Sequence, residues 1–229
     1  MKSLKNLLIK PLLEIGIFLG GLLLPQDEKV EKLSRMEDYK LREFLPKAEK
    51  VPDKLSSPIF NYRNKNVRTC IWAIKYKAHR VMIRKMSGFL YEEVLCLAEE
   101  ELLMQGKKKV ALVPIPASKR RVRKYGFNQC RLLCEEVVKI NKEIKIFDIL
   151  EKVRESDHQT RLSRTERIKN MKESIGLRRG YAGQVSVNIK DYLLIIIDDV
   201  YTTGATIKEA RRALAEAGFK NTFAVTLAH

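Results

Sequence analysis

Two adjacent carboxylates, and the small hydroxyl-rich loop after them, are the side chains of this chain best suited to chemistry. The carboxylates are Asp198 and Asp199, and the loop consists of Thr202, Thr203, Gly204, Ala205 and Thr206. Hydroxyl and backbone N–H groups at a helix N-terminus bind anions such as phosphate, and a glycine lets the backbone approach closely. Carboxylates repel phosphate, but they accept hydrogen bonds from ribose hydroxyls and can hold Mg²⁺. Each residue alone could merely end a strand or cap a helix, but the combination predicts a sugar-phosphate site.

The elements that must position this site follow a strand, helix, strand order. We expect a buried strand over 192–197, a helix over 207–217 that ends at Gly218, and a strand over 222–227. This order predicts a parallel sheet with helices on its faces, whose ligands bind at the carboxyl ends of the strands. The chain contains neither GxxxxGK[ST] nor GxGxxG, which argues against a P-loop nucleotide hydrolase and against a dinucleotide site.

The preceding sequence supplies further elements of such a sheet. Apolar residues at helical spacing over 67–104 predict a helical hairpin, or one helix with a break near His79. A further helix is expected over 126–140, and short strands over 110–113 and 144–150. Prolines interrupt residues 26–66, which we expect to form a linker with short helices, and the polar stretch 151–180 is expected to be a long mobile loop.

The composition is that of a basic globular protein. Among 229 residues, 45 Lys and Arg against 28 Asp and Glu produce a net charge of +17, and 45% of the residues are hydrophobic. This hydrophobic content excludes a chain that is disordered for want of a core, and the charge suggests a polyanionic partner or a phosphorylated ligand. The four cysteines form no CxxC, which favours reduced thiols in a cytoplasmic protein. Cys130 and Cys134 share a helical face and could offer two metal ligands, but without a partner pair nearby we expect packed core thiols.

An apolar run over residues 7–24 raises the question of a membrane anchor. Lys10, Pro11 and Glu14 interrupt this run, and it is shorter than a comfortable span. We therefore expect an amphipathic helix that packs on the body or lies on a surface, with no stable membrane insertion.

Residues 192–206 resemble the phosphoribosyl-pyrophosphate (PRPP) motif of type I phosphoribosyltransferases. Three further stretches are similar to signatures of the ComF family, which itself resembles the phosphoribosyltransferase half of glutamine amidophosphoribosyltransferase. They are Val113-Pro-Ile-Pro116 with Lys124-Tyr-Gly-Phe-Asn-Gln129, Gln159-x-x-Leu-Ser163 with Arg167-x-x-Asn170, and Ile74-Lys-Tyr76. Together the resemblance covers residues 74–228, although Tyr125 stands where the family commonly has arginine.

The resemblance implies a fold and an activity. The fold would be an α/β domain of the type I phosphoribosyltransferase kind over residues 65–229, with a mainly parallel sheet flanked by helices, behind an N-terminal helical segment and linker over 1–64. The activity would be phosphoribosyl transfer from PRPP with Mg²⁺, in a protein that acts in DNA uptake during natural transformation. The family usually opens with a cysteine-rich zinc module, but no cysteine precedes Cys70. We therefore expect no zinc.

The same resemblance implies roles for particular residues. Asp198 and Asp199 would form the catalytic pair beside the ribose, with Mg²⁺ carried by PRPP. The loop from Thr202 to Thr206 would hold the 5′-phosphate. The pyrophosphate would face a loop made of Ala117, Ser118, Lys119 and Arg120. A flexible loop would close over the substrate and would contribute Gln159, Arg167 and Asn170.

The segment from 107 to 131 carries many basic side chains and no acidic one. Four of them are candidates for contacts with the phosphates of single-stranded nucleic acid, namely Arg120, Arg121, Arg123 and Lys124. A solvated basic face without a ligand is the alternative. This leaves a rival function open, a non-catalytic adaptor that binds nucleic acid or senses PRPP, with single-stranded DNA and a helicase-like competence protein as partners.

Overall fold

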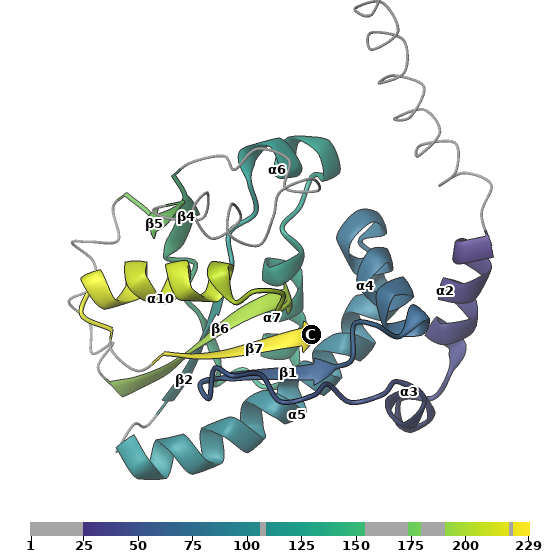
Figure 1. Cartoon of the computed structure of the whole chain (residues 1–229), viewed down its shortest axis with the longest axis horizontal. Coiled ribbons are helices and arrows are strands. Elements are labelled where there is room, and N and C mark those ends of the chain that lie inside the picture. The colour runs from purple at the N-terminus through teal and green to yellow at the C-terminus, as the bar shows by residue number, and fades with distance from the viewer. Residues whose placement is uncertain (1–24, 106–108, 154–173, 180–190, 220–221) are drawn as a thin grey trace, which may run out of the picture.

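Short apolar runs of the chain form strands, and the amphipathic segments between them form helices, in a computed structural model that describes residues 25–105, 109–153, 174–179, 191–219 and 222–229 (Figure 1). The helices are α2 (Pro25–Arg35), α3 (Asp38–Phe44), α4 (Lys65–Lys77), α5 (Arg80–Gln105), α6 (Lys119–Tyr125), α7 (Gln129–Ile140) and α10 (Ala205–Glu216). The strands are β1 (Ser56–Phe60), β2 (Lys109–Pro114), β3 (Lys145–Ile146), β4 (Leu150–Lys152), β5 (Ile175–Leu177), β6 (Tyr192–Val200) and β7 (Phe223–Ala228).

The main sheet has the strand order β1-β7-β6-β2-β3, and every neighbouring pair is parallel. The central strand β6 pairs Ile196 with Val113 of β2 and Ile197 with Val225 of β7. Its side chains alternate between two hydrophobic clusters, because successive residues of a strand point to opposite faces. Both faces are therefore buried, which explains why this strand is apolar throughout rather than alternating.

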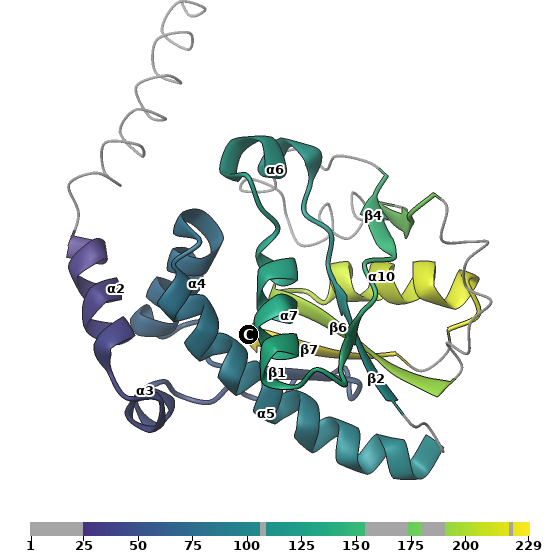
Figure 2. The same ribbon diagram turned by 180° about the vertical axis from the view of Figure 1, so that it is seen from behind.

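Helices cover the two faces of the sheet. Figure 1 shows α10 across one face, and Figure 2 shows α5 and α7 across the other. Apolar residues of α10 such as Ile207 and Leu214 belong to the smaller cluster, whereas Met86 and Leu90 of α5 belong to the larger one. A short antiparallel pair, β4 with β5, lies at the side of the sheet where α10 packs.

The helices near the carboxyl ends of the strands begin at side-chain caps or end at residues in the left-handed conformation. Ala78 adopts a left-handed conformation (φ 47°) and separates α4 from α5. Gly126 (φ 83°) ends α6, and the side chain of Asn128 accepts a hydrogen bond from the N–H of Cys130 at the start of α7. These turns place α4, α6 and α7 around the end of β6.

The structure confirms the α/β class with a mainly parallel sheet, the helical hairpin broken near His79, and the strands and helix of the segment after residue 191. Three expectations were wrong in part. The strand expected over 144–150 is two short strands in different sheets, the helix expected over 126–140 begins at Gln129, and the stretch 151–180 expected to be a loop contains the strand β5, which pairs with β4. The helix α6 was not foreseen.

Strand β1 lies in the stretch expected to be a linker, and it pairs with β7 at the edge of the sheet. The linker was expected because prolines interrupt the stretch, but an edge strand tolerates Pro58, a residue that donates no backbone hydrogen bond.

Within the described ranges, no helix has the length and apolarity that a membrane crossing requires. The apolar run over 7–24 lies outside those ranges. Cys130 and Cys134 are both buried, as core thiols should be.

Candidate functional site

The two carboxylates lie at the carboxyl end of β6, and both are buried. Asp198 and Asp199 are 8% and 5% exposed. One oxygen of Asp198, Oδ1, accepts a hydrogen bond from the backbone N–H of Asp199 at 2.8 Å and one from the thiol of Cys130 at 3.5 Å. Two adjacent acids inside a protein are costly without partners, so the groups around them decide whether the pair can remain charged.

Asp199 is held by a closed ring of polar contacts that joins α4, α6, α7 and β6. The ammonium of Lys75 on α4 lies 2.8 Å from Oδ1 of Asp199, and the amide of Gln129 on α7 donates to Oδ2 at 2.6 Å. Gln129 in turn accepts from Nε of Arg121 on α6 at 3.0 Å, and Nη2 of Arg121 donates to the backbone carbonyl of Lys75. The ring satisfies both oxygens of Asp199 and connects the acidic pair to the helix after β2.

Burial and charge shift the pKa values of these groups in different directions. Burial, and then the neighbouring charge of Asp199, raise the pKa of Asp198 to about 7. Burial alone would lower the pKa of Lys75, but the charge and hydrogen bond of Asp199 raise it above its usual value. Burial also raises the pKa of Cys130, so its thiol stays neutral and can donate to Asp198. Lys75 is thus the charge that compensates the acidic pair.

The loop between β6 and α10 has the backbone shape of an anion site. Gly204 is left-handed (φ 73°) and precedes the first residue of α10, and Oγ1 of Thr203 accepts from the N–H of Ala205 at 3.4 Å. A methyl group on Gly204 would lie 2.4 Å from the hydroxyl oxygen of Tyr201, so the loop requires glycine for space as well as conformation. Thr202 is exposed, and Thr206 is half-buried in the first turn of α10. The first N–H groups of an α-helix have no backbone partner within it, and the positive end of the helix dipole lies there.

The loop after β2 reaches the same edge of the sheet. Ala117 and Ser118 are half-buried, and the hydroxyl of Ser118 accepts from the N–H of Arg121 to cap α6. Lys119, Arg120, Arg123 and Lys124 of α6 are exposed, whereas Arg121 belongs to the ring around Asp199. Arg121 therefore serves to position the acidic pair, and its neighbours on α6 present charge to solvent.

Among the described residues, one group of potential metal ligands meets at this point. One ligand atom each from Cys130, Asp198 and Asp199 lies within 4.8 Å of the others. The two carboxylates offer the oxygen donors that Mg²⁺ prefers, whereas a buried neutral thiol does not suit it. Lys75 already neutralises Asp199, so the residues fit an ion that arrives bound to an anionic ligand better than a dedicated ion held by the protein.

No protein-family model matches the chain, but curated proteins do. Competence protein ComFC of Streptococcus pneumoniae is 30% identical over 163 residues, which cover 71% of this chain and 63% of that protein. Competence protein ComFC of Bacillus subtilis is 34% identical over 119 residues, 48% of this chain and 40% of that protein. Competence protein F of Haemophilus influenzae is 28% identical over 136 residues, which cover 59% of this chain and 56% of that protein. The chain belongs to the ComF family. It spans between two fifths and two thirds of the length of these relatives.

Two of the stretches that resemble ComF signatures meet the PRPP-like motif at the acidic pair. Lys75 comes from the stretch 74–76, Gln129 from 124–129 and Asp199 from the motif 192–206. In the sequence, Lys75 and Gln129 stood out only as members of motifs that resemble the family, and no role could be assigned to either residue. The thiol of Cys130 was expected only as a core residue, and its contact with Asp198 carried no signal in the sequence. Gln159, Arg167 and Asn170 lie outside the described residues.

Proposed function

We propose that this chain binds PRPP at the carboxyl end of β6 and acts as a phosphoribosyltransferase-like protein of the type I fold. One observation carries the proposal: the buried pair Asp198 and Asp199 lies at the end of the central strand of a parallel sheet, and Gly204, the residue that caps α10, follows five residues after Asp199. A ribose requires hydrogen-bond acceptors, and its 5′-phosphate requires N–H donors a short distance away. This edge of the sheet supplies both.

In this proposal the acidic pair accepts hydrogen bonds from the ribose hydroxyls, and residues Thr202 to Thr206 hold the 5′-phosphate. Lys119 and Arg120 would face the pyrophosphate from the start of α6. A nitrogen nucleophile forms a bond to the anomeric carbon while the carbon–oxygen bond breaks, and pyrophosphate leaves with the electron pair. The carboxylates stabilise the positive charge that develops on the ribose, so catalysis needs positioning and electrostatics rather than a covalent nucleophile of the protein.

Asp198 and Asp199 would also lie near a Mg²⁺ ion that accompanies PRPP. Such an ion would neutralise part of the negative charge of the pyrophosphate. Lys75 keeps Asp199 charged and oriented by the contact already formed, and Gln129 fixes its second oxygen.

We further propose that the protein acts in competence, in the uptake of DNA, because the relatives that it matches are named competence proteins. A second function on the same fold is a non-catalytic adaptor that binds single-stranded DNA and a helicase-like partner, or senses PRPP. The exposed cations Arg120, Arg123 and Lys124 of α6 favour it, because they can contact phosphates without disturbing the ring around Asp199.

The test is calorimetric titration of PRPP with Mg²⁺ into the purified protein and three variants. Asp198→Asn and Asp199→Asn remove one charge each from the pair, and Asp191→Asn removes a charge just before the opposite end of β6 as a matched control. We expect saturable binding by the native chain and by Asp191→Asn. In the other two variants the affinity for PRPP should fall at least tenfold. If the folded native chain does not bind PRPP, the proposal is wrong. If it binds PRPP but transfers phosphoribose to no nitrogen base, the sensing function replaces the enzyme.

A further inference from the structure

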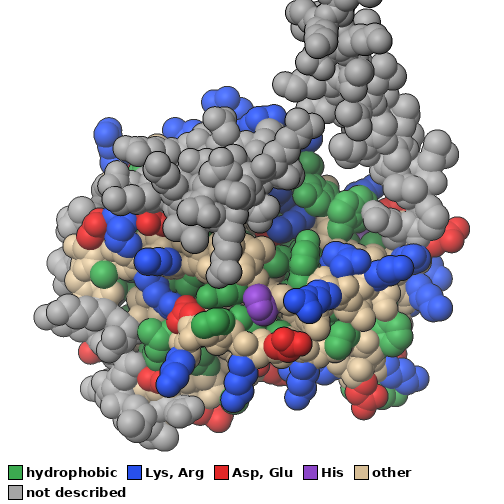
Figure 3. Space-filling model, in the orientation of Figure 1, with side chains coloured by type: hydrophobic (Ala, Val, Ile, Leu, Met, Phe, Trp, Pro, Cys, Tyr) green, Lys and Arg blue, Asp and Glu red, His purple; other side chains and the backbone are tan. Residues whose placement is uncertain are grey.

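A pocket with a volume of about 470 Å³ lies between α2 and α4, and it is lined by Lys75, whose ammonium contacts Asp199. Besides Lys75, its cations are Lys29, Lys65 and Arg68, and its aromatic side chains are Tyr62, Trp72 and Tyr76. None of the described side chains that line it is acidic. Figure 3 shows Lys and Arg side chains on this side of the molecule. The volume is in the range of sites for small organic ligands.

The aromatic surface of this pocket continues toward α6. The ring of Trp72 lies 6.1 Å from that of Tyr76, and Tyr76 lies 5.3 Å from Tyr125. Cations stand over these rings: Lys77 is 5.5 Å from the ring of Trp72, and Arg121 is 5.0 Å from that of Tyr125. Tyr76 is 41% exposed. A core would not leave such a ring in water, so these side chains form a surface on which a flat ligand can stack.

Cations and aromatic faces together select a particular ligand chemistry. An aromatic base stacks on Trp, Tyr or Phe, and a phosphate attached to it pairs with Lys and Arg. A lipid surface would require a broad apolar patch, and an inorganic anion would gain nothing from three aromatic rings. The ligand that uses both halves of the pocket is a nucleotide.

We propose that this pocket binds a nucleotide unit, with its base against Trp72 and Tyr76 and its phosphate near Lys29, Lys65 and Arg68. Lys75 lines the same pocket while its ammonium contacts Asp199, so the nucleotide lies next to the acidic pair. The inference rests on the pocket alone and not on PRPP binding. The nucleotide can be free or part of a single strand, since both present the same base and phosphate.

Trp72 is the only tryptophan of the chain, so its fluorescence reports on this pocket alone. We would titrate the full chain with thymidine 5′-monophosphate, with a short oligothymidylate, with an oligonucleotide of the same length made of abasic sites, and with deoxyribose 5-phosphate. Stacking of a base quenches indole emission. We expect saturable quenching by the first two ligands and little by the two that lack a base. Tighter binding of the oligothymidylate by about a hundredfold would identify a single strand as the source, and equal binding would identify the free nucleotide.

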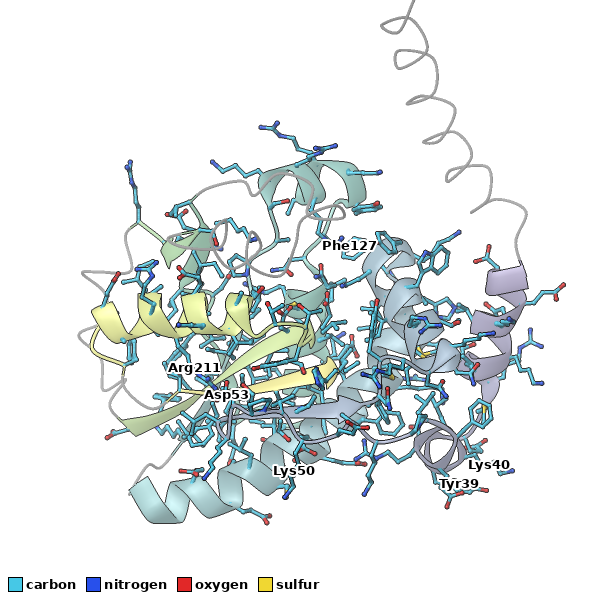
Figure 4. The ribbon with its side chains drawn as sticks, viewed as in Figure 1. Tyr39, Lys40, Lys50, Asp53, Phe127 and Arg211 are labelled. Carbon is cyan, nitrogen blue, oxygen red and sulfur yellow. The ribbon has the colours of Figure 1, made fainter. Side chains whose placement is uncertain are left out.

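Two double variants separate this pocket from the general positive charge. Lys29→Gln with Lys65→Gln removes two pocket cations, and Lys40→Gln with Lys50→Gln removes the same charge elsewhere. Figure 4 shows Lys40 on α3 and Lys50 in the segment before β1. We expect the affinity measured by quenching to fall about tenfold in the first double variant and less than about twofold in the second.

A third variant, Tyr76→Ala, removes an exposed stacking surface, and we expect the affinity for the base-containing ligands to fall about tenfold. Circular dichroism would check that each variant folds. Absence of quenching by both base-containing ligands, equal quenching by the abasic strand, or equal losses in the two double variants would each overturn the proposal.

Discussion

The contact between Lys75 and Asp199 offers the sharpest test of how this site is held together. Changing Lys75 to Met keeps the length of the side chain but removes the cation, and leaves a buried carboxylate beside a second one. Loss of one partner of a buried ion pair costs about 3–5 kcal/mol. Lys75 is 24% exposed, so we expect the lower end of that range, about 3 kcal/mol. For a chain of this size the melting temperature should fall by about 6–12 °C.

A double-mutant cycle isolates the pair from other effects of the substitution. Asp199→Asn alone removes one of two neighbouring negative charges and leaves Lys75 able to reach water, so it should cost less than about 1 kcal/mol. In the double variant Lys75→Met with Asp199→Asn the carboxylate that Lys75 contacted is gone as well, and Asp198 keeps its hydrogen bonds from the N–H of residue 199 and from Cys130, so most of the lost stability should return. We expect a coupling energy of about 2 kcal/mol, measured by urea unfolding followed by far-ultraviolet circular dichroism.

The matched control is Lys77→Met, two residues along the same helix. The exposed Lys77 forms a surface ion pair with Asp27 at 3.6 Å and lies 5.5 Å from the ring of Trp72, so its loss should change stability by less than about 1 kcal/mol. A coupling energy below about 0.5 kcal/mol between Lys75 and Asp199, or equal losses for the two lysine variants, would refute the conclusion that Lys75 compensates the acidic pair.

Two further predictions concern the loop after β6 and the segment before β1. Gly204→Ala should destabilise the protein by about 1–2 kcal/mol and abolish PRPP binding, because its methyl group meets the hydroxyl of Tyr201 and its backbone is left-handed; unchanged calorimetric binding would contradict this. Burial would raise the pKa of Asp53, but hydrogen bonds from Ser56 and Arg211 and the charge of Arg211 lower it below 3.8, and Figure 4 shows Asp53 beside Arg211. The stabilisation from Asp53 should be complete at neutral pH and be lost as the pH falls through the lowered pKa, so the stability difference from Asp53→Asn should shrink between pH values of about 5 and 2. A difference that stays constant over that range would show that the charge of Asp53 contributes nothing.

The parallel sheet and the place of the acidic pair could be predicted because their signals are local. A run of apolar residues over 192–197 can only be buried, and the glycine and threonines after it are typical of a turn into a helix. The edge strand β1 and the short strands β3 and β4 could not be predicted in the same way. Their pairing depends on neighbours far away in the chain, and Pro58 in β1 is acceptable only because that strand lies at an edge.

The sequence by itself determined the α/β class, the positive charge and the position of Asp198 and Asp199 at the end of a buried strand. Only the tertiary structure decided which side chains satisfy that pair. Lys75 and Gln129 lie 124 and 70 residues before Asp199, and no periodicity or spacing connects residues so far apart. The cost of burying charge explains why they must meet: two adjacent carboxylates inside a protein require a cation and hydrogen-bond donors, and packing of α4 and α7 on the sheet brings them there.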